Sequence, residues 1–104
     1  MILTTGETIP NKNVIEILGI ARGSTVRAKN IGSDIFAGLK NIVGGELHEY
    51  TKLQADAREQ AFQRMVEDAE KLGADAIIGI RLQSSTITQG ASEILAYGTA
   101  VKIN

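Results

Sequence analysis

The apolar and polar positions of the chain change their spacing several times, and each change predicts a new element of secondary structure. Residues 14–29, VIEILGIARGSTVRAK, are rich in β-branched residues and leucine, which is typical of a β-strand. Gly19 and Gly23 interrupt the run and leave two interpretations open. Either residues 22–25 form the turn of a hairpin, or the whole run is one long strand with a bulge at glycine. Gly-Ser is a weak two-residue turn, so the pattern favours the single bent strand.

A short helix is predicted for residues 33–43, because apolar side chains recur there with the 3.6-residue period of one helix face. Ser33 is suited to the N-cap position. Gly44 can adopt the left-handed conformation that commonly ends a helix, and Gly45 then lets the chain turn away.

A longer helix is expected to start at Thr51, because Thr51 and Gln54 form a capping box. Gly73 ends it. Its apolar stripe contains three alanines, which predicts a close approach to the layer beneath. The stripe consists of Leu53, Ala57, Ala61, Phe62, Met65, Ala69 and Leu72.

The C-terminal part of the chain predicts a hairpin of two strands, residues 75–88 and 92–103, with a Gln-Gly turn between them. Simple alternation places one apolar face of the first strand at Ala76, Ile78, Ile80 and Leu82. The second strand is apolar or small on both faces. These faces are Leu95, Tyr97, Thr99, Val101 and Ile103 on one side, and Ile94, Ala96, Gly98 and Ala100 on the other.

This order of elements predicts an α+β protein, a two-layer βαββ sandwich with a mainly antiparallel sheet, in a single domain of residues 1–104. Two helices cover only one face of such a sheet. A lone antiparallel sheet turns a polar second face to water, whereas here Ile77 and the last strand bring apolar side chains to both faces. The simplest cover is another copy of the chain, so a homo-oligomer is expected.

Composition narrows the functional classes. Lys+Arg 11 against Asp+Glu 12 gives a formal net charge of -1, so no bulk electrostatic attraction to nucleic acid or to an anionic membrane is expected. The chain has no cysteine, which excludes disulfides, thiolate nucleophiles and thiolate metal ligands. The start, MILTTGETIP, lacks the features of a signal peptide, and no run approaches the roughly 20 apolar residues of a membrane span. These features predict a soluble cytoplasmic protein.

His48 is the only histidine, and it gives the one pattern that suggests a metal ion. The stretch HEYTK at residues 48–52 resembles the H-E-x-x-H motif of zinc proteases, but Lys52 replaces the second histidine ligand. Glu46, His48 and Glu49 are therefore candidate ligands only for an ion whose coordination a neighbouring subunit completes. One histidine and no cysteine argue against a high-affinity site for a soft metal within one chain.

No other constellation predicts a reaction or a cofactor. The two glycines of NIVGGELHEY follow a predicted helix, and the two glutamates after them would repel a phosphate. Ser84, Ser85 and Ser92 have only the distant histidine as a potential base, and no G-x-S-x-G turn is present. Asp34 and Asp75 stand at the starts of elements, where carboxylates commonly have a structural role. No catalytic and no cofactor-binding residue is assigned.

Three stretches together resemble one protein family: NIGSDIFAGLKNIVGGELHEYTKL, the LGADAIIG run and the closing ILAYGTAVKI. They resemble the YbjQ-like proteins, small bacterial and archaeal proteins of uncharacterised function, over essentially the whole chain. The resemblance implies a dodecin-like βαββ fold and a ring-shaped homo-oligomer of five subunits, a pentamer. It also implies an additional short strand that helps assembly, and we assign residues 2–5 to that strand.

The family is sometimes labelled heavy-metal-binding, and such a label needs more soft ligands than this chain supplies. The resemblance brings no catalytic residues to the sequence. We therefore expect a non-enzymatic binding or scaffold protein, with any ligand at a subunit interface or at the axis of the ring, near residues 30–34 or 44–50. The alternative is a metal-binding protein that shares Glu46, His48 and Glu49 between neighbouring copies. An enzyme with a composite interface site ranks last.

Overall fold

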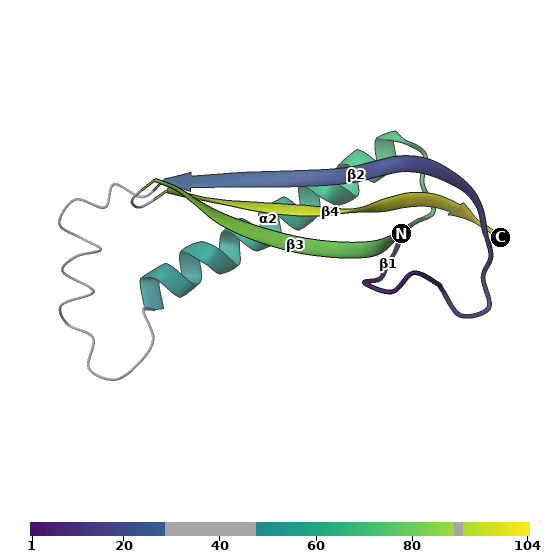
Figure 1. The fold of residues 1–104 in the computed structure, drawn as a ribbon, viewed down its shortest axis with the longest axis horizontal. Coiled ribbons are helices and arrows are strands. Elements are labelled where there is room, and N and C mark those ends of the chain that lie inside the picture. The colour runs from purple at the N-terminus through teal and green to yellow at the C-terminus, as the bar shows by residue number, and fades with distance from the viewer. Residues whose placement is uncertain (29–47, 89–90) are drawn as a thin grey trace.

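The computed structural model describes residues 1–28, 48–88 and 91–104. They form four strands and one helix, and Figure 1 shows the sheet as one layer with the helix as a second layer against it. The elements are β1 (Ile2–Leu3), β2 (Val14–Ala28), α2 (His48–Lys71), β3 (Ala76–Thr88) and β4 (Ala91–Ile103). The predicted helix of residues 33–43, the glycines after it and the turn at residues 89–90 lie outside the described residues.

The four strands form one sheet in the order β1-β3-β4-β2. β4 is antiparallel to both of its neighbours, and β1 is parallel to β3. The predicted α+β class, with a mainly antiparallel sheet and a short extra N-terminal strand, is therefore confirmed. That strand is the first half of the predicted segment 2–5. The pairing continues just beyond it, because the N–H of Thr4 donates to the carbonyl oxygen of Ile77 at 3.1 Å.

β2 decides the question that the sequence left open, because residues 14–28 form one strand and not a hairpin. Its register with β4 shifts twice, between Val14 and Glu16 and between Ile17 and Gly19. Gly19 has a φ of 136°, a conformation that residues with a Cβ rarely adopt. The glycine thus permits the bulge that bends the strand.

Gly23 marks a very close approach between α2 and the sheet. A Cβ at this position would overlap the backbone of α2 at Ala61, Arg64 and Met65. The predicted alanine stripe permits this contact, because small side chains let the helix backbone lie directly on the strand. Leu72 does not belong to the buried stripe and is exposed. The core between the layers consists of Ala21, Ala57, Ala61, Met65, Ala69, Ile77, Ile80, Ile94, Ala96 and Ala100.

α2 begins at His48, one turn before the predicted start at Thr51. The capping box therefore identified the helix but not its first residue. The preceding residues do not oppose the extension, because the negative charge of Glu49 is favourable in the first turn of a helix. The predicted start of this helix at Thr51 is therefore wrong.

The other end of α2 follows the prediction. Gly73 has a φ of 80°. Its N–H donates to the carbonyl oxygen of Glu70 at 3.0 Å, and the N–H of Ala74 donates to that of Ala69 at 3.1 Å. This pair of bonds is the Schellman arrangement, which satisfies two of the last carbonyl groups of the helix.

The prediction for the faces of β3, with Ala76, Ile78, Ile80 and Leu82 together, is wrong. Ile77 and Ile80 are buried in the core against α2. The register with β4 shifts between Ile78 and Arg81, so an extra residue interrupts the alternation of side chains. Gly79 lies within this interruption and has a φ of 62°. The bulge therefore changes which residues face the helix.

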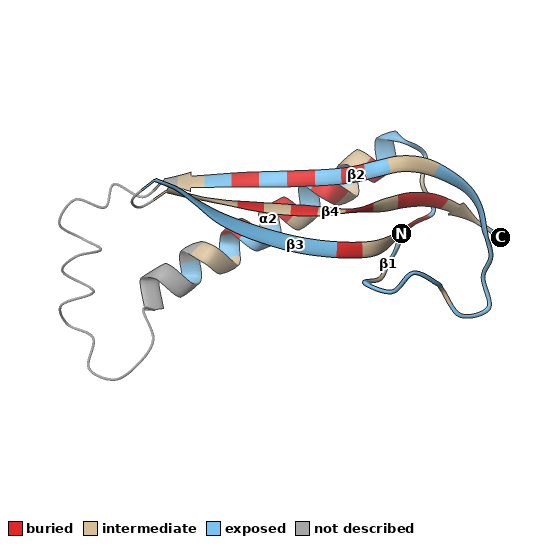
Figure 2. Ribbon diagram, viewed as in Figure 1, coloured by how far each residue is buried: buried red, intermediate tan, exposed pale blue. Residues whose placement is uncertain are grey.

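We call the sheet surface away from α2 the open face. Ile17 and Ile20 on this face are 70% and 65% exposed, and Figure 2 shows exposed and buried residues alternating along β2. Apolar side chains of this face lie mainly along β2 and β4, whereas its β3 side carries Ile78 among polar residues, and Ile77, which the sequence predicted for this face, lies in the core. By strand register, the open face carries Ile17, Ile20, Arg22, Ser24 and Val26 of β2, Leu95, Tyr97 and Thr99 of β4, and Ile78, Arg81, Gln83 and Ser85 of β3.

Candidate functional site

The three predicted metal ligands fall at or before the start of α2. Glu46 lies outside the described residues, and the structure describes the backbone of His48 and Glu49 but not their side chains. Within residues 1–28, 48–88 and 91–104, no group of three or more His, Cys, Asp or Glu side chains could hold a metal ion. A donor set of one histidine and no cysteine does not fit a heavy-metal site built by a single chain.

The three serines that sequence analysis left without a role lie around one cavity of about 410 Å³ between α2, β3 and β4, which we call the serine cleft. Gln54 and Arg58 of α2 form one wall of the cleft. Its described lining is Gln54, Arg58, Leu82, Gln83, Ser84, Ser85, Thr86, Ser92 and Ile94. Sequence reasoning missed this site because its residues come from three elements; the only local signal was the one-turn spacing of Gln54 and Arg58.

The chemistry of the serine cleft is that of a polar binding surface. The Gln54 side-chain amide donates to the Ser92 hydroxyl oxygen at 3.1 Å. The described lining offers the guanidinium of Arg58 together with hydroxyl and amide groups, and it contains neither an imidazole nor a carboxylate. A serine hydroxyl needs an adjacent base to act as a nucleophile. The described lining can hold a small polar or anionic molecule but supplies no such base.

A second, apolar groove runs beside α2 on its β3 side. It exists because α2 packs mainly on β2 and only slightly on β3. One cavity of about 350 Å³ is lined by Leu3, Thr4, Thr5, Phe62, Ile80, Arg81 and Leu82. A neighbouring cavity of about 430 Å³ is lined by Leu3, Glu59, Phe62, Gln63, Val66, Glu67 and Glu70. The two cavities share Leu3 and Phe62, and the second also has the acidic side chains of Glu59, Glu67 and Glu70 on the helix.

On its other side, α2 supplies polar side chains to the outer edge of β2. Asp68 Oδ2 accepts a hydrogen bond from the N–H of Arg22 at 3.0 Å. Arg64 Nη1 donates to the carbonyl oxygen of Ser24 at 2.7 Å. β2 is the last strand of the sheet, and these two backbone groups bond to α2 and not to β4. The helix thus satisfies the middle of this edge with side chains.

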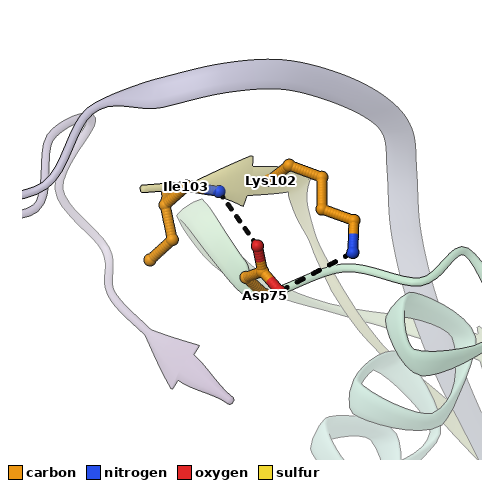
Figure 3. A network of polar contacts seen from close by, with 3 residues as sticks. All are labelled: Asp75, Lys102 and Ile103. Atoms are coloured by element: carbon orange, nitrogen blue, oxygen red, sulfur yellow. Dashed lines mark hydrogen bonds and ion pairs between the residues drawn. The ribbon is translucent and has the colours of Figure 1, made fainter.

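Asp75 joins the start of β3 to the end of β4, as Figure 3 shows. Its Oδ2 accepts a hydrogen bond from the N–H of Ile103 at 3.1 Å, and its Oδ1 lies 3.7 Å from Lys102 Nζ. Both charged side chains are about 40% exposed, so the ion pair adds little to stability. These contacts agree with the structural role that the sequence predicts for this carboxylate.

Comparison with known proteins identifies the family. A family model described as "Putative heavy-metal-binding" matches residues 1–104. The chain belongs to the YbjQ-like family. The resemblance seen in the sequence is thereby confirmed over the full length of the chain.

Relatives of this YbjQ-like chain occur in archaea and bacteria. It is 57% identical over 103 residues to a "UPF0145 protein" of Methanosarcina acetivorans, a match that covers 99% of this chain and 97% of the relative. It is 56% identical over 103 residues to a "UPF0145 protein" of Vibrio campbellii, with 99% of both chains covered. These names state a family and no activity, so they lend the non-enzymatic interpretation only weak support.

A solved structure supports the fold. A protein of unknown function from Pediococcus pentosaceus, assigned to the DUF74 family, matches with a TM-score of 0.68 at 17% identity. The match covers 100% of this chain and 98% of that one. In the part of the chain that the structure describes, no helix is long and apolar enough to cross a membrane.

Proposed function

We propose that this YbjQ-like chain is a non-enzymatic cytoplasmic binding or scaffold protein whose copies assemble into a ring. The observation that carries the proposal is the open face, where Ile17 and Ile20 are 70% and 65% exposed. Fully covering an isoleucine side chain contributes about 1.5 to 3 kcal/mol, so a protomer alone leaves a substantial driving force unused. The pentameric stoichiometry rests on the family resemblance.

Light scattering coupled to size exclusion tests the assembly at micromolar concentration. The expected result is a single species of several protomers, and a monomer would contradict the proposal. Ile20→Asp is expected to dissociate the assembly without unfolding the protomer, because the open face of one protomer already leaves this side chain largely in water. Leu72→Asp is the matched control, since Leu72 is also exposed but lies at the end of α2 away from the open face.

The serine cleft is a candidate for ligand binding in such a scaffold. It combines a guanidinium, several hydroxyl groups and an apolar floor of Leu82 and Ile94. This combination suits a small molecule with one anionic group, because a guanidinium binds a carboxylate or phosphate through two parallel hydrogen bonds. Native mass spectrometry of the protein purified from its source would report both the stoichiometry and any retained molecule.

The family description favours a second candidate, a metal-binding protein. In this alternative Glu46, His48 and Glu49 act as ligands from neighbouring copies, since one chain alone lacks a sufficient donor set. Zinc or copper is then expected to raise the melting temperature by binding the folded assembly. His48→Ala should abolish this shift, whereas Lys52→Ala, one helical turn away, should retain it. If neither zinc nor copper changes the melting temperature of the wild-type protein, this alternative is wrong.

A further inference from the structure

The two long edges of the sheet differ in how their backbone groups are satisfied. An exposed edge is a template for another strand, and proteins normally protect such edges with charges, proline or covering side chains. In the middle of β2, Asp68 and Arg64 provide this protection at Arg22 and Ser24. No hydrogen bond from other described residues reaches the outer edge of the first half of β2, residues 14–20.

The edge of β3 is protected over its first half only. The N–H of Ile80 donates outward to the carbonyl oxygen of Thr4 at 3.1 Å, and its carbonyl oxygen accepts from its neighbour Arg81 at 2.8 Å. Since backbone direction alternates along a strand, the N–H groups of Leu82, Ser84 and Thr86 also point outward. Among the described residues no strand pairs with them on that side.

The unprotected half of β3, residues 81–88, has the character of an interface. All eight residues are exposed, including the apolar Leu82 and Ile87 at 47% and 55%. The stretch RLQSSTIT contains no proline and no lysine, and the side chain of its one charged residue, Arg81, is bonded back to Thr5 and Ile80. The residues on this edge therefore do little to oppose strand addition.

We propose that the β3 edge of one copy, residues 81–88, pairs with the first half of β2, residues 14–20, of a second copy. This inference rests on the proposed ring. Each protomer has both an unprotected β3 edge and an unprotected β2 edge, and the two are of nearly equal length. A single kind of contact, repeated from copy to copy, would therefore pair all of these edges. A contact between two different surfaces propagates from copy to copy and closes when the rotation completes a circle.

The direction and the register of this contact follow from the sheet. β2 and β3 are both antiparallel to β4, so copies arranged around an axis to which the strands are tilted would pair β3 with the neighbouring β2 in parallel. Arg22 and Arg81 both lie opposite Tyr97, and the first half of β2 therefore meets the β3 edge only if the copies are staggered along the strand. Stagger is what a sheet needs to close on itself.

The stagger also explains which part of β2 carries exposed isoleucines. In the joined sheet Gln83 and Ser85 would lie beside Ile17 and Ile20 of the neighbouring copy and would cover part of the apolar surface that a protomer alone leaves in water. The protected middle of β2 would lie beyond the contact, so Asp68 and Arg64 would keep their present hydrogen bonds. The helix side chains thus set the limit of the paired segment.

The natural absence of cysteine makes disulfide trapping a direct test. Two double variants, Ile17→Cys with Gln83→Cys and Ile17→Cys with Ser85→Cys, place thiols on the open face at the two nearest registers. Under mild oxidation at least one is expected to give a ladder of covalently linked protomers on a non-reducing gel, because the Cα atoms would come within disulfide range. Glu70→Cys with Ser85→Cys is the control and should give no ladder, since Glu70 is exposed on the helix layer.

A proline variant provides a second measurement. Ser84→Pro removes an outward N–H without breaking the ladder to β4, so it should leave the circular dichroism spectrum intact and shift light scattering to the monomer. An assembled protein that gives no ladder with either pair, and that stays assembled as Ser84→Pro, overturns this interface but leaves the proposed ring standing. A wild-type monomer overturns both.

Discussion

Replacing Gly23 with alanine should destabilise the protein far more than the loss of one hydrogen atom suggests. A Cβ at this position overlaps the nitrogen of Met65, the oxygen of Ala61 and the carbonyl carbon of Arg64. All three are backbone atoms of α2, so no side-chain rotation can make room. The helix must lift from β2, which separates Ala61 and Met65 from the core that they now share with Ala21.

The size of the destabilisation depends on the fact that the Cβ would meet backbone atoms of the helix. Adding a methyl group to a well-packed core costs about 1 to 3 kcal/mol when neighbours can adjust, and a rigid backbone obstacle places Gly23→Ala near the upper end. For a domain of this size each kcal/mol lowers the melting temperature by about 4 to 8 °C, so a decrease of at least about 10 °C is expected.

Urea unfolding followed by circular dichroism measures this effect, at one protein concentration because association contributes to apparent stability. Gly6→Ala is the matched control, since its Cβ would lie 3.4 Å from the Thr4 hydroxyl oxygen, a contact that a small shift accommodates. If Gly23→Ala unfolds at the same urea concentration as the wild type, the close packing of α2 on β2 is wrong.

Three smaller changes test other features by the same urea titration. Gly79→Ala should cost about 1 to 2 kcal/mol, because alanine must adopt the left-handed φ of 62° although nothing lies within 4 Å of its Cβ; an unchanged midpoint would argue against the bulge. Asp68→Ala should cost about 1 kcal/mol by removing the acceptor of the Arg22 N–H, and Asp68→Asn should recover part of that loss. Asp75→Ala should cost about 1 kcal/mol of unfolding free energy, mainly through loss of the hydrogen bond to Ile103, so most of the effect should persist in high salt. If high salt abolishes the effect, the ion pair with Lys102 contributes more than the hydrogen bond.

Local patterns in the sequence were sufficient to predict the elements that pack through one continuous stripe. The alanines and Met65 of α2 lie on the buried side because a 3.6-residue period allows no other common face. The end of the helix at Gly73 was also predictable, because glycine readily adopts the left-handed conformation found there, with a φ of 80°. The first residue of α2 was not, because a capping box is compatible with helical residues before it.

The candidate sites were harder to predict because they depend on which elements become neighbours. Gln54 and Ser92 are separated by 38 residues and meet only because α2 packs against β4. No pattern in the sequence assigns a role to Arg64 or Asp68. Their role at the edge of β2 depends on the position of α2 over the last strand of the sheet, which no local pattern specifies.

The error in the predicted faces of β3 has a physical cause that also acts in β2, and it bears on the proposed assembly. Side chains alternate between the two faces of a strand only while each residue lies opposite one residue of the neighbouring strand. In both β2 and β3 this alternation is interrupted at a glycine with positive φ. At Gly79 the extra residue turns Ile80 toward α2. At Gly19 the shift places both Ile17 and Ile20 on the open face, where strict alternation would have put only one of them. The same bulge that bends β2 therefore concentrates isoleucine on the open face, beside the edge through which we propose that the copies pair.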